Sequence, residues 1–133
     1  MTGETSLTTL LRSMSPQLNS GEYVFCTLPD GPLPHGLEIV GSFREQEGLT
    51  VILERSVAQQ AGFSFDYVAA WITLNVHSAL QAVGLTAAFA TALGEAGISC
   101  NVIAGYYHDH LFVGQADAER AMHVLRDLAA NAE

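Results

Sequence analysis

Residues 71–114, WITLNVHSALQAVGLTAAFATALGEAGISCNVIAGYYHDHLFVG, carry the clearest structural pattern of this chain. Trp71–Val76 alternates apolar with polar side chains, which predicts a strand with one buried face. From Gly84 to Ala96 the apolar residues recur at spacings of three and four, the pattern of an amphipathic helix. Ile98–Ala104 and Asp109–Val113 then predict two strands joined by a tight turn. The order strand, loop, helix, strand, strand therefore organises this half of the chain.

The residues on either side of this stretch predict the remaining elements. Pro16 ends the first helix, and the turn residues of 29–36 predict an irregular connection. The expected elements are a helix over Leu7–Met14, strands over Glu22–Leu28, Leu37–Glu45 and Leu49–Leu53, a short helix at Val57–Ala61 and, at the chain's end, a helix that begins near Asp117.

These patterns divide the chain into two halves with related orders of elements, residues 1–66 and residues 67–133. The first reads helix, three strands, helix, and the second reads strand, helix, two strands, helix. This order predicts an α+β fold of two small sandwiches, with helices on one face of antiparallel sheets. Neither half completes a six-element βαββαβ unit alone, so we expect the strand over Tyr67–Val76 to join the halves or to be shared between them.

Composition limits the classes of function. The chain of 133 residues is 49% hydrophobic and only 14% charged, so it has material for a core. Its net charge of −9 repels phosphate backbones and anionic lipids, which argues against nucleic-acid and membrane partners. We find no secretory signal and no membrane-spanning stretch, and the two cysteines, Cys26 and Cys100, suit reduced core thiols; these features favour a cytoplasmic protein.

No enzyme signature is apparent, and the protein is expected to be non-catalytic and to need no cofactor. The only residues with metal-ligand spacing are His108 and His110, which would share one face of a strand, with His77 as a third ligand. The alternative is a polar turn stabilised by Asp109. We expect no metal and keep the three histidines as the alternative site.

A small anion or zwitterion is the expected ligand, because the helix that begins near Gly84 presents free N–H groups and a positive dipole end. Gly84 leaves room for the ligand, and Gly84→Val should weaken binding while leaving the fold largely intact. Ser78 and Thr86 have an alternative role as helix caps. The expected ligand contacts are Ser78, Val83, Gly84, Leu85, Thr86 and, from the next strand, Asn101.

The sequence resembles an ACT domain in Ile72–Thr86 and in Leu93–Ser99, and its turn at Ala104–Val113 is similar to that of aspartate-kinase-type ACT repeats. The whole chain also resembles short bacterial proteins of unknown function with two ACT-like modules, through Glu22–Pro29 and Phe43–Thr50. The resemblance implies a ferredoxin-like sandwich that senses small molecules, most often amino acids. It also implies pairing with a second copy.

We therefore expect a non-catalytic regulatory or sensor protein that binds a small molecule, an amino acid by the resemblance, and forms a homodimer or a higher homo-oligomer. The alternative is a protein–protein interaction module that keeps the ACT scaffold without a ligand. Fold alone does not separate the two.

Overall fold

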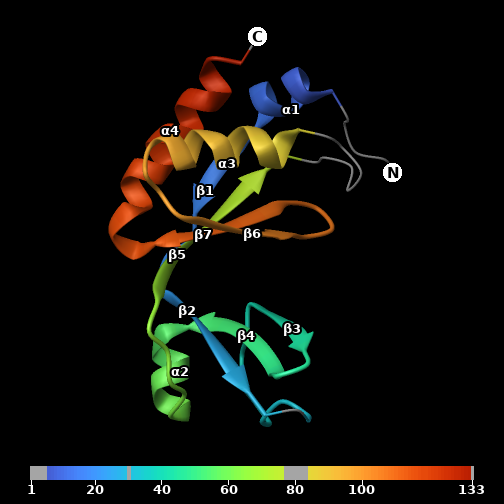
Figure 1. The fold of residues 1–133 in the computed structure, drawn as a ribbon, viewed down its shortest axis with the longest axis vertical. Coiled ribbons are helices and arrows are strands. Elements are labelled where there is room, and N and C mark those ends of the chain that lie inside the picture. The colour runs from blue at the N-terminus through green and yellow to red at the C-terminus, as the bar shows by residue number, and fades with distance from the viewer. Residues whose placement is uncertain (1–5, 30, 77–83, 133) are drawn as a thin grey trace. The chain divides into compact units, whose positions relative to one another are not determined.

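The computed structural model describes residues 6–29, 31–76 and 84–132. It has an α+β fold with antiparallel strands, as predicted (Figure 1). The chain divides into two compact units. We call Gly21–Ala69 the continuous unit and Met1–Ser20 with Ala70–Glu133 the discontinuous unit.

The discontinuous unit is a sandwich of helices on a sheet in which the strands follow the order β1-β5-β7-β6. Antiparallel register joins β1 to β5 from Ser15 opposite Asn75 to Leu18 opposite Ile72. Its elements are α1 (Leu7–Ser13), β1 (Ser15–Leu18), most of β5 (Val68–Asn75), α3 (Leu85–Glu95), β6 (Cys100–Ala104), β7 (Asp109–Gly114), the 3₁₀ turn η1 (Gln115–Asp117) and α4 (Ala118–Ala130).

Strand β1 was not predicted from the sequence. Its four residues include Pro16, which we took only as the end of the first helix. The order β5-α3-β6-β7-α4 lacks the last strand of a βαββαβ unit, and β1 occupies that place beside β5. The N-terminal segment thus completes the sheet of the C-terminal elements.

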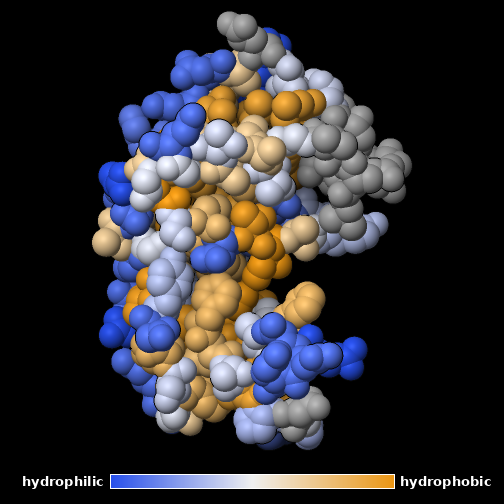
Figure 2. All heavy atoms as spheres, viewed as in Figure 1, coloured by the Kyte–Doolittle hydropathy of each residue, from blue (hydrophilic) through white to orange (hydrophobic). Residues whose placement is uncertain are grey.

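The core of the discontinuous unit lies between its helices and one face of its sheet. Alternate residues of β5 face it, and the intervening ones, Trp71 and Thr73, face the other way. Figure 2 shows polar side chains gathered on the outer side of α4. The core is built mainly from Leu10, Ala70, Ile72, Leu74, Leu85, Phe89, Leu93, Leu111, Val113, Met122 and Leu125.

Among its described residues, the continuous unit holds the strands β2 (Tyr23–Leu28), β3 (Gly41–Glu45) and β4 (Gly48–Glu54) and the helix α2 (Arg55–Ala61) around a smaller core. Val24, Cys26, Val51, Leu53 and Ala58 form that core. Strand β4 pairs with both β2 and β3.

Strand β3 is shorter than the strand predicted over Leu37–Glu45, because it begins at Gly41. Leu37 and Ile39 pack against the core of the continuous unit outside the strand. Their apolar character therefore reports burial and not membership of the ladder. Next to Gly41, the N–H of Val40 donates a hydrogen bond to the carbonyl of Ile52.

Strand β5 contributes to both units, as the sequence led us to expect. Its first residues pair with β2, Val68 opposite Val24 and Ala69 opposite Tyr23. Its later residues pair with β1. The predicted division between residues 66 and 67 stays a prediction. No helix of the described residues is long and apolar enough to cross a membrane.

Candidate ligand-binding site

Helix α3 begins at a glycine in the left-handed region, where Gly84 has φ 100° and ψ −20°. A Cβ built on Gly84 would lie 3.2 Å from Cδ2 of Leu7 on α1. Glycine is therefore needed for the turn and for the packing of α1. The expectation that Gly84→Val leaves the fold intact is contradicted, since valine would be strained at this φ and would press on Leu7.

The next two residues differ in which of their groups can meet a ligand. Leu85 is buried in the core, so only its backbone amide could contact one. Thr86 is exposed on the first turn. The amides of that turn have no acceptor inside the helix, and the 11-residue helix places the positive end of its dipole there. An anion is the chemistry that this position favours.

Asn101 extends from the opposite side of the sheet. It lies opposite Phe112, and Val102 beside it packs against the core that α3 covers. Because side chains alternate along a strand, Asn101 points away from the face that carries α3. The structure thus brings Gly84, Leu85 and Thr86 together and places Asn101 elsewhere. Three further predicted residues, His77, Ser78 and Val83, lie outside the described residues.

His110 is held by neighbours within the discontinuous unit. Its Nδ1 accepts the indole N–H of Trp71 over 3.1 Å and lies 3.3 Å from the hydroxyl oxygen of Thr73. The Trp71 bond requires the tautomer with the proton on Nε2, because an indole nitrogen can only donate. The lone pair of Nδ1 on His110 is therefore used by this hydrogen bond and is not available to a metal ion.

His108 does not share the strand with His110, since β7 begins at Asp109. Its Nδ1 is buried and without a hydrogen-bond partner among the described residues. Within residues 6–29, 31–76 and 84–132, no group of three or more His, Cys, Asp and Glu could hold a metal ion. The described residues therefore do not assemble the alternative metal site of His108 and His110. Its third predicted ligand, His77, lies outside the described residues.

Burial shifts the pKa of two side chains in the hairpin of β6 and β7. Burial lowers the pKa of His110; neighbouring His108 increases this effect, and the charge of Asp109 opposes it. Burial also raises the pKa of Asp109, against the opposing effect of His110 and His108. The His110 ring is consequently neutral at pH 7, as its bond from Trp71 requires.

A polar network that sequence reasoning missed joins β1 and the residue just after it, Asn19, to β5. The side-chain amide of Asn19 donates to the Thr73 hydroxyl over 3.0 Å and to the Trp71 carbonyl over 3.2 Å. Farther along, Asn75 donates to the Gln17 side chain over 3.1 Å. These partners are more than fifty residues apart in sequence, so no local spacing could have revealed them. The network satisfies Thr73, which is buried on the sheet face away from the helices.

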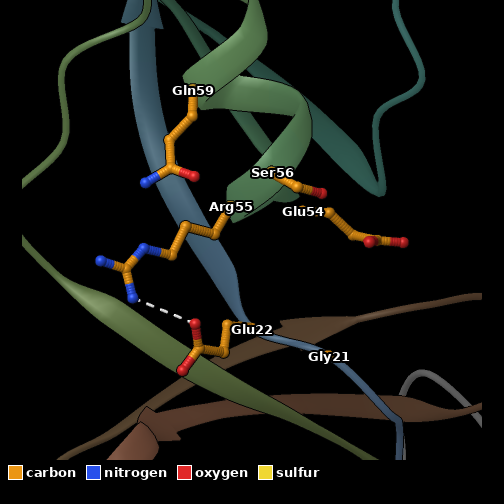
Figure 3. A pocket seen from close by; sticks show the side chains of 6 residues that line it. All are labelled: Gly21, Glu22, Glu54, Arg55, Ser56 and Gln59. Carbon is orange, nitrogen blue, oxygen red and sulfur yellow. Dashed lines mark hydrogen bonds and ion pairs between the residues drawn. The ribbon is translucent and has the colours of Figure 1, made fainter.

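An open cavity of about 470 Å³ lies beside α2 in the continuous unit. Figure 3 shows the side chains of Arg55 and Glu22 pointing toward each other, with the Gln59 amide above the guanidinium. Nη1 of Arg55 lies 3.0 Å from Oε1 of Glu22, and the Arg55 amide donates to the Glu22 carbonyl over 2.9 Å. These bonds fasten the start of α2 to β2, which is a structural role.

Two family comparisons match this architecture. One model of the ACT domain matches residues 2–70, and a second ACT-domain model matches residues 67–127. The chain belongs to the ACT-domain family. ACT domains are typically ligand-binding regulatory modules. Comparison with functionally curated proteins gave no match.

Solved structures extend the likeness. A protein of unknown function from Vibrio cholerae, described as a possible transport protein, is 55% identical with a TM-score of 0.84, and the alignment covers 96% of this ACT chain and 99% of that one. The regulatory subunit of aspartate kinase from Thermus thermophilus shares the fold alone, at 10% identity and a TM-score of 0.59, covering 85% of this chain and 95% of its own. A protein from Agrobacterium tumefaciens likewise shares the fold, at 18% identity and a TM-score of 0.65, covering 87% and 89%.

Proposed function

We propose that this ACT protein is a non-catalytic regulatory protein that binds a small carboxylate ligand, an amino acid, at the start of α3. Membership of a family of ligand-binding regulatory modules supports the role. The single observation that carries the position is the start of an 11-residue helix at left-handed Gly84, with Thr86 exposed on a first turn whose amides have no acceptor inside the helix.

The contacts proposed for the ligand differ in kind. The backbone amides of Leu85 and Thr86 would meet the carboxylate, and the Thr86 hydroxyl would donate to it. Ser78 and Val83 complete the proposal from the preceding residues. Asn101 extends from the other face of the sheet. The substitution Asn101→Ala therefore tests whether the ligand site reaches round the edge strand β6.

We also propose that two copies pair through β6. The edge strand β3 carries Arg44 and Glu45, and β1 is short and carries Pro16, all features that oppose edge-to-edge pairing. Cys100–Ala104, which form β6, include no charge and no proline. Ile103 is 41% exposed on β6, and the next turn exposes 70% of Tyr106 and 65% of Tyr107. An uncharged edge beside exposed aromatic rings suits a second copy of the chain.

A cytoplasmic location completes the proposal. Both cysteines, Cys26 and Cys100, are free, and burial raises the pKa of each thiol. Thiols in that state persist in a reducing compartment.

A thermal-shift screen against the twenty amino acids, with purines and divalent metals alongside, tests the ligand. A ligand at about one hundred times its Kd should stabilise the fold by about 2.7 kcal/mol, which raises the Tm by several degrees. If no amino acid moves the Tm, the amino-acid proposal is wrong, and the interaction module without a ligand becomes the better account.

Calorimetry with the amino acid from that screen then locates the site. Thr86→Val removes one hydroxyl from an exposed position and should weaken binding about tenfold or more, since a hydrogen bond to a charged group contributes about 1.5 kcal/mol or more. Thr91→Val is the matched control, because Thr91 is exposed farther along the same helix. Equal affinity in the two variants would place the site elsewhere.

A further inference from the structure

The continuous unit contains a second cavity, of about 600 Å³. It lies along the part of β2 that has no pairing with β5, because β2 pairs with β5 only through Tyr23 and Val24. The later residues of β2 line the cavity together with the segment after α2 and the ends of β3 and β4. We call it the aromatic cavity, and the residues that matter are Phe25, Thr27, Glu45, Thr50, Phe65 and Asp66.

The charge of this lining has one sign. Glu45 and Asp66 supply two carboxylates, and among the described residues no lysine, arginine or histidine lines the cavity. The net charge of the whole chain, −9, adds to the negative potential. An anionic ligand is therefore disfavoured, and a cation is favoured.

Two phenylalanine rings supply the apolar part of the lining. A ring face attracts a cation through its quadrupole, and the fold already uses this property at Phe65. The guanidinium carbon of Arg55 lies 5.8 Å from the centroid of the Phe65 ring. Arg55 is itself paired with Glu22 and lines the cavity of Figure 3 instead of this one. Phe25 and Phe65 can thus accept both an apolar group and a positive charge.

The hydroxyl groups of Thr27 and Thr50 add hydrogen-bond acceptors to the lining of the cavity. Thr27 lies opposite Thr50 on neighbouring strands, so their side chains share one face. The Thr50 hydroxyl donates to Oε1 of Glu45, which orients that carboxylate and leaves its second oxygen to accept another donor. Carboxylate acceptors form their stronger hydrogen bonds with charged N–H donors, which a primary ammonium supplies and a quaternary ammonium lacks.

We propose that the aromatic cavity binds a primary amine that carries an apolar or aromatic group. Its ammonium lies against Glu45 and Asp66, and its apolar part lies against Phe25 and Phe65. A volume of about 600 Å³ falls within the range of small-molecule sites. This site is independent of the ligand proposed at α3, because every lining residue belongs to the continuous unit.

Calorimetry of the full chain with 2-phenylethylamine tests the proposal. We expect saturable binding with a Kd of about 1 mM or tighter, and binding at least about tenfold weaker for the neutral isostere 2-phenylethanol and for anionic 3-phenylpropionate. Absence of saturable heat up to about 10 mM amine overturns the proposal. Equal binding of the alcohol also overturns it, since the cavity would then recognise only the ring.

Neutralising variants locate the ammonium. Asp66 and Glu45 are both exposed, so Asp66→Asn and Glu45→Gln should not lower the Tm. Each substitution should weaken amine binding about five- to tenfold. Glu119→Gln, an exposed carboxylate on α4, makes the same change of charge in the discontinuous unit and should leave affinity unchanged. An equal loss in Glu119→Gln would overturn the proposal in favour of bulk charge. Thr86→Val should bind the amine normally, which separates failure here from failure of the α3 site.

Discussion

The indole N–H of Trp71 donates to Nδ1 of His110 over 3.1 Å, between the neighbouring strands β5 and β7. The bond holds the histidine in one tautomer and satisfies a half-buried donor. Because Nδ1 must keep its lone pair, protonation of the ring would break this bond. The pair therefore links the stability of the discontinuous unit to pH.

Stability should fall as the pH drops below about 6.5, the ordinary pKa of histidine. Burial lowers the pKa of His110 in the folded state, so the unfolded chain binds the proton more readily and the loss continues down to the folded pKa. Asp109 contributes a pH dependence of the opposite sign. Its pKa is raised above 3.8 in the folded state, so acidification toward that range favours the folded state. Thermal melts from about pH 7.5 to 5.5 measure the His110 slope.

The variant His110→Gln should lose most of that slope. His123→Gln is the control, because the His123 side chain is 78% exposed and pairs with Asp127 on the same helix. A slope that is unchanged in His110→Gln would assign the pH dependence to another group.

Two glycines should respond to alanine with opposite signs. A Cβ at Gly105 would lie 2.8 Å from the carbonyl oxygen of His108, so Gly105→Ala should lower the free energy of unfolding by about 1–3 kcal/mol. A Cβ at Gly94 on α3 meets nothing within 4 Å, so Gly94→Ala should raise it by about 0.5–1 kcal/mol. Urea denaturation measures both values, and a destabilised Gly94→Ala protein would contradict the packing described for α3.

The contribution of α1 to the discontinuous unit can be measured at Leu10. Its side chain is fully buried in the core with Phe89 and Leu125, so Leu10→Ala should cost about 2–5 kcal/mol. Leu7→Ala, on the same helix but 37% exposed, should cost less. Urea denaturation of both proteins makes the comparison. Equal, small losses would mean that α1 does not belong to this core.

Pairing of copies through β6 predicts an unequal effect of two lysine substitutions. Ile103→Lys puts a charge on the uncharged edge and should convert a dimer to a monomer. Phe43→Lys changes a residue that is 74% exposed on the edge strand β3 and should leave the dimer intact. Sedimentation measures both, and a wild-type monomer at high concentration would rule out the pairing.

Local patterns were sufficient to predict most elements of this fold. The alternation from Trp71 predicted β5, and the three-and-four spacing after Gly84 predicted α3, which ends at Glu95. Strand β1 was missed because its four residues have weak strand propensity and its partner lies more than fifty residues away. Only pairing with β5 makes it a strand.

The candidate site was less accessible to sequence reasoning. The helix start at Gly84 was predicted because glycine and periodicity are local signals. The orientation of Asn101 depends on the register of β6 with β7, which one sequence does not give. The pairing of Trp71 with His110 depends on β5 lying next to β7, which local spacing also cannot reveal.

The origin of β1 at the N-terminus has a consequence for synthesis on the ribosome. The continuous unit is encoded by an unbroken stretch, Gly21–Ala69, and needs only the first residues of β5 to complete its ladder. Strand β1 comes earlier in the chain and must wait for its partners on β5, such as Thr73 opposite Gln17, and for α4, against which it packs. Closing so long a loop is slow, so the continuous unit should fold before β1 takes its place beside β5.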